Sequence, residues 1–174
     1  MIHFKKIFSS HIDVLFFFSH QNYLICMFKF LGWKDLWEKG IFPWHKDSIN
    51  PKLEKYWSIL LQAAGKSKPE ECRFFVPLCG KTKDLLFLRS KGFQVIGCEG
   101  VHQACTDFFT ENSINDMEKV ELEPGMTSYA TKDGKLKIIG GDYFKLTPDL
   151  LGGKVDCVWD RGSLVAIDLG DREK

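Results

Sequence analysis

The chain has 174 residues, of which 44% are hydrophobic and 27% are charged, and its formal net charge is +1. This length suffices for one domain with a hydrophobic core, and the composition is that of a soluble globular protein. Because Lys and Arg are dispersed among acidic residues, the charge pattern gives no electrostatic basis for binding nucleic acid or an anionic membrane.

The first thirty residues differ in character from the rest and hold seven of the fifteen phenylalanines. Their longest apolar run, residues 14–18, is far shorter than the roughly 18 residues that span a bilayer. No small-residue cleavage site follows the run, and the segment contains no Arg. We predict that residues 1–30 form an extension of unknown role, poorly ordered and unrelated to the domain. An interfacial membrane anchor is the alternative.

Helices and strands then alternate along the chain. A helix is predicted to begin at Asn50-Pro51, because Asn caps helices and Pro suits their first position. Apolar residues recur on one helical face at positions 53, 57, 60, 61 and 64. The apolar run 73–78 predicts a buried strand that ends in a turn at Cys79-Gly80. Residues 83–91 predict the next helix, which Gly92 ends.

The second half of the chain continues the alternation. Residues 93–98 predict a second strand that ends on an acid, Glu99, and apolar residues at 101, 105, 108 and 109 predict a helix after it. Asp133-Gly134 marks a hairpin turn before a third strand at 136–139, which Gly140-Gly141-Asp142 follows. The fourth predicted strand, residues 155–159, precedes Asp160-Arg161-Gly162.

Strands that are apolar throughout, separated by amphipathic helices, indicate a parallel sheet covered on both faces. Right-handed crossovers then favour a doubly wound, Rossmann-like α/β fold. Ligands of such folds bind beyond the carboxyl ends of the strands. We therefore expect Gly80, Glu99, Asp142 and Asp160-Arg161 to face one crevice.

The loop after the first strand indicates which cofactor this crevice suits. It contains a single glycine, Gly80, and neither the G-x-G-x-x-G of dinucleotide sites nor a phosphate-binding loop is present. S-adenosyl-L-methionine (AdoMet) has no phosphate and needs an acid for its two ribose hydroxyls. Glu99, at the end of the second strand, can accept from both hydroxyls, and Asp142 can accept from the adenine amino group with Tyr143 beside the ring. The alternative for each acid is a solvated residue at a strand end.

The cysteines give no sign of disulfides or of a metal site. They lie far apart, without a C-x-x-C pair or zinc-site spacing, at positions 26, 72, 79, 98, 105 and 157. Several lie in apolar runs, where free thiols pack as small hydrophobic groups in a reducing compartment. We expect a cytoplasmic protein without metal.

Three motifs and one upstream stretch together resemble the thiopurine S-methyltransferase family. The motifs are FVPLCGK at 75–81, VIGCE at 95–99 and WDRGSLVAI at 159–167, and the stretch is WKDLWEKG at 33–40 with Trp44-His45 after it. The resemblance covers about residues 31–174. It implies a class I methyltransferase fold and transfer of the AdoMet methyl group to a small-molecule thiol, aromatic or heterocyclic.

The resemblance also implies roles for individual residues. Trp33, Trp37 and the turn up to Trp44 would close over the cofactor, with Trp44 at the position of a smaller aromatic residue that contacts substrate. Leu78 and Gly80 would line the methionine end of AdoMet, Glu99 the ribose, and Asp142 and Tyr143 the adenine. Arg161 would stand at the junction of cofactor and acceptor, as the catalytic residue. From spacing alone, Trp33 and Trp37 could instead be core packing, and Arg161 could pair with Asp160 or Asp171.

The family continues beyond the point at which this chain stops, so we expect the sheet to be incomplete at the C-terminus. Residues 31–174 would then be the N-terminal part of the domain, which is expected to be monomeric when complete. The strand at 155–159 would lie at an exposed edge, so we expect the chain as it stands to aggregate and to lack turnover. The alternatives are a non-catalytic AdoMet-binding fragment and a nicotinamide oxidoreductase, which the missing G-x-G-x-x-G disfavours.

Overall fold

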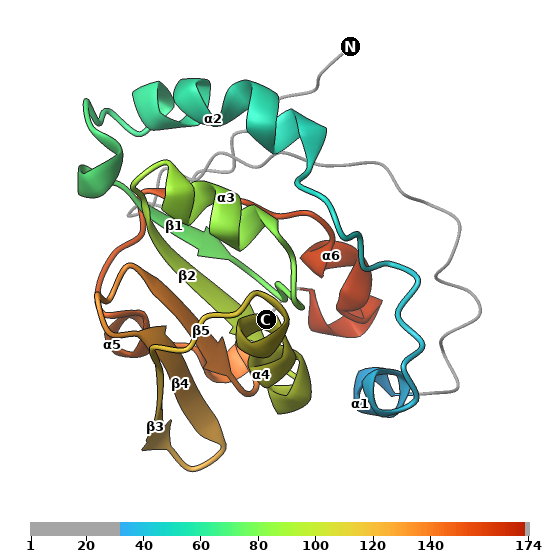
Figure 1. Cartoon of the computed structure of the whole chain (residues 1–174). Coiled ribbons are helices and arrows are strands. Elements are labelled where there is room, and N and C mark those ends of the chain that lie inside the picture. The colour runs from blue at the N-terminus through green and yellow to red at the C-terminus, as the bar shows by residue number, and fades with distance from the viewer. Residues whose placement is uncertain (1–31, 173–174) are drawn as a thin grey trace.

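The computed structural model describes residues 32–172, so the predicted extension at 1–30 lies outside the described residues. Within that range six strands form one sheet in the order β3-β4-β5-β2-β1-β6 (Figure 1). Four of them are parallel, and they are the four strands predicted from the apolar runs: β1 (Arg73–Val76), β2 (Gln94–Glu99), β5 (Leu136–Gly140) and β6 (Cys157–Val158). The α/β prediction is thereby confirmed.

The sheet is mixed rather than wholly parallel, which corrects the prediction. Two strands that the sequence did not indicate, β3 (Met117–Glu123) and β4 (Met126–Thr131), form an antiparallel hairpin. β4 also pairs antiparallel with β5 across the predicted turn at Asp133-Gly134. The loops between β3 and β4 and between β4 and β5 hold only a few residues each. Such short loops allow antiparallel pairing, whereas a parallel pair would need a long crossover. β3 was missed because it carries almost no buried side chain and hence no apolar run.

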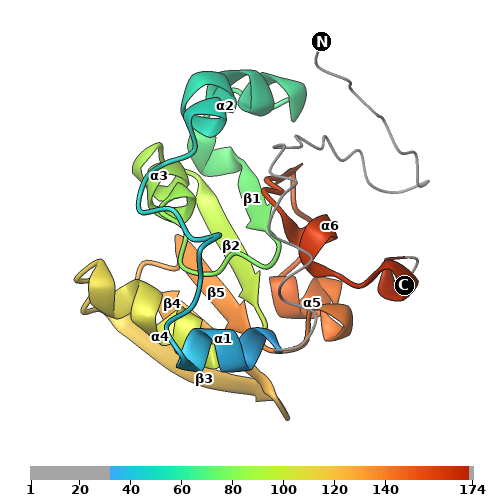
Figure 2. The same ribbon diagram turned by 90° about the vertical axis from the view of Figure 1, so that its right-hand side faces the viewer.

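Helices cover both faces of the sheet. α2 (Pro51–Ala63), α3 (Asp84–Ser90) and α4 (His102–Glu111) lie on one face, and α5 (Pro148–Leu151) and α6 (Ser163–Ala166) lie on the other side (Figure 2). Strand side chains alternate between the two faces: Phe74 packs with the helices of the first, and Phe75 with Leu150 on the second. The predicted cap of α2 is confirmed, since the Asn50 side chain accepts from the backbone N–H of Lys52 at 3.0 Å.

β6 lies at one edge of the sheet and pairs with β1. Its position therefore agrees with the predicted edge strand, although the side chains of Cys157 and Val158 are buried against the two faces. The remaining elements are short: α1 (Trp33–Glu38) and the 3₁₀ turns Pro69–Glu71, Tyr143–Lys145 and Leu169–Asp171. α1 stands apart from the main core and packs through Trp37 against Val101 and Ala104.

Candidate functional site

The loop between β1 and α3 turns sharply at the carboxyl end of β1. Two of its residues have left-handed backbone conformations, Leu78 with φ of 41° and Gly80 with φ of 53°. Glycine adopts this conformation without strain, whereas for leucine it is unusual and is often found at functional sites. A Cβ atom on Gly80 would lie 3.4 Å from the Trp37 ring. The loop therefore presents bare backbone directly beneath a tryptophan.

The Glu99 carboxylate joins this loop to the end of β2. One oxygen accepts from the backbone N–H of Gly80 at 2.8 Å, and the other accepts from Val101 at 2.9 Å. The side chain is 7% exposed. Burial raises the pKa of Glu99, while the backbone N–H donors act in the opposite direction. Each carboxylate oxygen keeps a further lone-pair site, so the acid can still accept from ligand hydroxyls.

Asp142 and Tyr143 follow at the end of the neighbouring strand. The backbone N–H of Gly141 donates to the carbonyl of Glu99 at 2.9 Å, which holds the ends of β5 and β2 together. A Cβ on Gly141 would lie 2.5 Å from the Gly125 carbonyl oxygen, so only glycine fits there. The exposed Asp142 caps the next turn by accepting from Phe144 N at 3.0 Å. Tyr143 is half-buried, and burial raises its pKa.

Aromatic side chains gather over the loop. Trp44 contacts Trp33 edge-on at 5.0 Å between ring centroids and Trp37 at 6.2 Å, and Trp37 stacks on Phe42 at 4.7 Å. Trp37 is 6% exposed and Trp33 is 43% exposed. Trp37 therefore packs beside Gly80 within a small buried cluster that includes Val101 and Ala104. Trp33 is more exposed and contacts Trp44.

Lys81 lies beneath the same cluster. Its ammonium is 4.6 Å from the centre of the Phe42 ring and 5.8 Å from that of Trp37, and it forms an ion pair with Glu111 of α4. Its side chain is 7% exposed. Lys81 therefore links the aromatic residues after α1 to the end of α4 by cation–π and ionic contacts.

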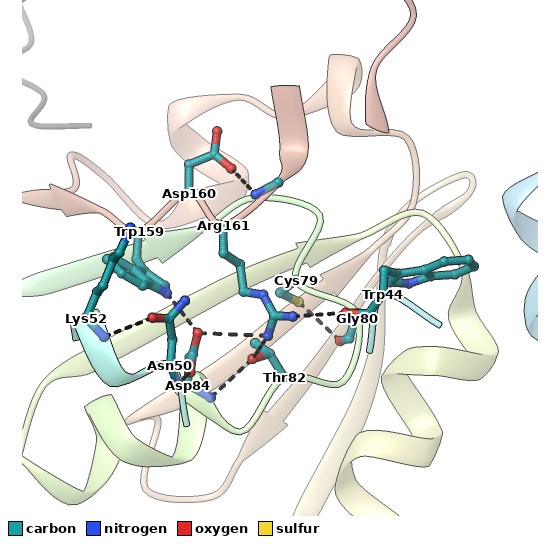
Figure 3. Close-up of polar contacts among 11 residues, drawn as sticks. Trp44, Asn50, Lys52, Cys79, Gly80, Thr82, Asp84, Trp159, Asp160 and Arg161 are labelled. Atoms are coloured by element: carbon teal, nitrogen blue, oxygen red, sulfur yellow. Dashed lines mark hydrogen bonds and ion pairs between the residues drawn. The ribbon is translucent and has the colours of Figure 1, made fainter. Parts of the chain in front are cut away.

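Arg161 points back across the sheet end toward the loop (Figure 3). Its guanidinium donates to the Thr82 hydroxyl at 2.5 Å and to the Trp44 carbonyl at 3.3 Å. The carboxylate beside it belongs to Asp84, 3.9 Å away. Asp160 is not that partner: it accepts from the backbone N–H groups of Gly162 and Ser163, each at 2.8 Å.

A polar pocket opens near these residues, lined by His45, Asp47, Lys81, Lys83, Glu111 and Asn112. Burial lowers the pKa of His45, and the charges of Lys81 and Arg161 lower it further. Sequence reasoning missed this pocket, as it missed Thr82, Lys81 and Asp84. Asp84 carried no distinctive signal, since an acid in the first turn of a helix is ordinary.

The structure thus brings most of the predicted site residues to one end of the sheet. Gly80, Glu99 and Trp37 are joined by the contacts above, and Arg161 is linked to them through Trp44. Leu78 lies in the same loop as Gly80. Asp142 and Tyr143 stand at the adjacent strand end. Among residues 32–172, no group of three or more His, Cys, Asp or Glu side chains is arranged to hold a metal, and no helix is long and apolar enough to cross a membrane.

Comparison with known proteins decides the family. A profile of the thiopurine S-methyltransferase family matches residues 29–174. The chain belongs to this family. It is 36% identical over 135 residues to the thiopurine S-methyltransferase of Methylococcus capsulatus, covering 78% of this chain and 56% of that protein.

Other thiopurine S-methyltransferases give similar values. The Bordetella petrii protein is 38% identical over 144 residues, which cover 82% of this chain and 60% of the relative. The Shewanella sp. strain MR-7 protein is 37% identical over 134 residues, covering 77% and 56%. The chain thus spans 56–60% of the length of these three relatives. The family resemblance stated from the motifs is confirmed.

The donor set suits the AdoMet that this family implies. Glu99 offers a buried carboxylate for hydroxyl groups, Asp142 an exposed acceptor at the next strand end, and Gly80 a backbone free of side chain. Nothing in the loop resembles a phosphate site.

Proposed function

We propose that the whole protein transfers the methyl group of AdoMet to the sulfur of an aromatic or heterocyclic thiol, and that this chain carries the AdoMet site. The observation that carries the proposal is the bond between the Glu99 carboxylate and the backbone N–H of Gly80. It places the acid expected to bind ribose against the loop expected to bind the methionine end. Family membership supports the reaction type.

The proposed cofactor contacts follow the strand ends. Glu99 would accept from the ribose hydroxyls, and Asp142 and Tyr143 would hold the adenine. Leu78 and Gly80 would line the methionine end of the cofactor. Trp33 and Trp37 would cover it, since Trp37 already lies against Gly80.

AdoMet would supply a methyl group bound to a sulfonium. The acceptor sulfur would form a bond to that carbon in line, the sulfonium sulfur would keep the electron pair of the broken bond, and the thiol proton would leave to water. An aromatic thiol ionises readily, so fixing the two reactants in line provides most of the acceleration, up to about 7–11 kcal/mol. Arg161 stays charged in any protein setting and would attract the thiolate. Trp44 would stand on the acceptor side, because its carbonyl holds that guanidinium.

Calorimetric titration of the whole protein with AdoMet, S-adenosylhomocysteine and NAD tests the cofactor site. We expect the two adenosyl compounds to bind and NAD not to bind. Binding of NAD alone would favour the oxidoreductase, and binding of none of the three would overturn the proposed site.

Radiolabelled methyl transfer from AdoMet to thiophenol by the whole protein tests the reaction. We expect labelled methyl phenyl sulfide. Arg161→Lys keeps the charge but loses the planar fork, so turnover should fall while the protein stays folded. Full turnover in Arg161→Lys would make the residue structural. AdoMet binding without transfer to any aryl thiol would favour the non-catalytic alternative.

A further inference from the structure

The Arg161 guanidinium contacts the side chains of Thr82 and Asp84, for which no contact with AdoMet or the acceptor is proposed. The Thr82 hydroxyl accepts from it at 2.5 Å, and the Asp84 carboxylate lies 3.9 Å from it (Figure 3). Thr82 and Asp84 are themselves joined, since the backbone N–H of Asp84 donates to the Thr82 hydroxyl at 3.3 Å. The side chain of Arg161 is 19% exposed, so these contacts are partly shielded from water.

Asp84 is fully buried, with 0% exposure. One carboxylate oxygen accepts from the backbone N–H of Asn50 at 2.7 Å, and the other accepts from the Trp159 indole N–H at 2.9 Å. Both donors are neutral, whereas a buried carboxylate is costly unless a cation balances it. Arg161 is the cation that the structure places beside it.

The same network reaches the segment that carries Trp44. Arg161 holds the Trp44 carbonyl at one end of this segment, and Asp84 holds the Asn50 N–H at the other. Asn50 lies 34 residues before Asp84, and Trp44 lies 117 residues before Arg161. The Arg161–Asp84 pair therefore contacts the proposed acceptor-side segment at both of its ends.

We propose that Thr82 and Asp84 are positioning residues that hold the Arg161 guanidinium where cofactor and acceptor meet, an inference that rests on the proposed function. The hydroxyl sets the direction of the guanidinium through its hydrogen bond. The carboxylate keeps the cation beside the loop when no acceptor is bound. Neither residue needs to touch the acceptor.

Thr82→Val tests the inference, because it keeps the shape of the side chain and removes the acceptor for Arg161. Thr82→Ser keeps the hydroxyl and serves as the rescue variant. Thr131→Val is a matched control: Thr131 is a buried threonine whose hydroxyl binds Asp133 in the β4–β5 turn, away from the site. We expect Thr82→Val to lower kcat/KM for thiophenol about tenfold, the effect of losing one hydrogen bond to a charged group. Thr82→Ser should recover most of the lost kcat/KM. Thr131→Val should not lower kcat/KM comparably, even where it lowers the melting temperature by a similar amount.

A double variant separates positioning from general destabilisation. If Thr82 acts through Arg161, Thr82→Val should have little further effect in an Arg161→Lys background. Equal effects in both backgrounds would overturn the proposal.

A second measurement does not depend on activity. In ¹⁵N-edited NMR spectra of the whole protein, hindered rotation should give resolved guanidinium signals for Arg161, and Thr82→Val should merge them while Thr131→Val leaves them resolved. Signals that are unchanged in Thr82→Val would overturn the positioning role. If the whole protein transfers no methyl group, the proposed function fails, yet these spectra still decide whether Thr82 holds Arg161.

Discussion

Replacing Glu99 should weaken both the loop and the cofactor site, because one carboxylate serves both. Glu99→Ala removes the acceptor for the N–H groups of Gly80 and Val101, which lie at 2.8 and 2.9 Å. Each donor left unpaired in a buried setting costs about 1–3 kcal/mol. Removing a buried carboxylate recovers part of this through relief of desolvation. We expect a net loss of about 2–4 kcal/mol, or roughly 10 °C in melting temperature.

The cofactor provides the second measurement. If Glu99 also accepts from the ribose hydroxyls, Glu99→Ala should weaken AdoMet by about 2–3 kcal/mol, which is roughly 30- to 150-fold in Kd. Calorimetric melts without ligand and titrations with AdoMet separate the two effects. A lower melting temperature with unchanged affinity would limit Glu99 to holding the loop. Unchanged values of both would refute the reasoning from the observed contacts.

The pH dependence of the same variant series has a definite sign. Burial raises the pKa of Glu99, so folding favours the protonated carboxyl. Its contribution to stability is then fully present below the unfolded pKa and is lost as pH rises through the folded pKa. Glu99→Gln does not titrate, so the free energy of unfolding of the wild type should fall relative to that of Glu99→Gln across this window. Urea melts across the window from the unfolded to the folded pKa of Glu99 measure this difference. A difference of the opposite sign would contradict the raised pKa of Glu99.

Three further predictions concern other residues. Lys81→Met removes the ion pair with Glu111 and the cation 4.6 Å from the Phe42 ring, so we expect α1 to lose hydrogen-exchange protection; unchanged exchange would show that the cation does not hold it. The Thr131 hydroxyl, with help from Lys135 N, lowers the pKa of Asp133 to about 2, so its stabilisation should be lost only as pH falls toward that value. Because this turn is exposed, the change in the free energy of unfolding should be below about 1 kcal/mol. Urea melts of Asp133→Asn should not show this pH-dependent change. Burial raises the pKa of Cys98 to about 12, so iodoacetamide at pH 8 should label its peptide only after unfolding, and fast native labelling detected by mass spectrometry would contradict this.

The sequence alone was sufficient to predict a strand wherever consecutive residues of that strand are buried. Each parallel strand is a short apolar run, because both of its faces are covered, and such runs can be recognised without knowing their partners. The Asn50 cap is equally local, since its side chain reaches only two residues along the chain. Glu99 could be placed at a strand end for the same reason. Its bond to Gly80, nineteen positions away, followed only once β1 and β2 were paired.

What the tertiary structure decided lies in the contacts between distant segments. β3 exposes nearly all of its side chains, so only its pairing with β4 makes it a strand. Arg161 has an acid, Asp160, next to it in sequence, yet its guanidinium lies beside Asp84. Parallel pairing of β1 and β6 brings together loops whose residues Thr82 and Arg161 are 79 positions apart. A charged side chain pairs with whichever group the fold places within a few ångströms, and no periodicity in the sequence encodes that distance. The predicted strand-end residues could therefore be listed in advance, whereas the residues that hold them in place became visible only when the chain was folded.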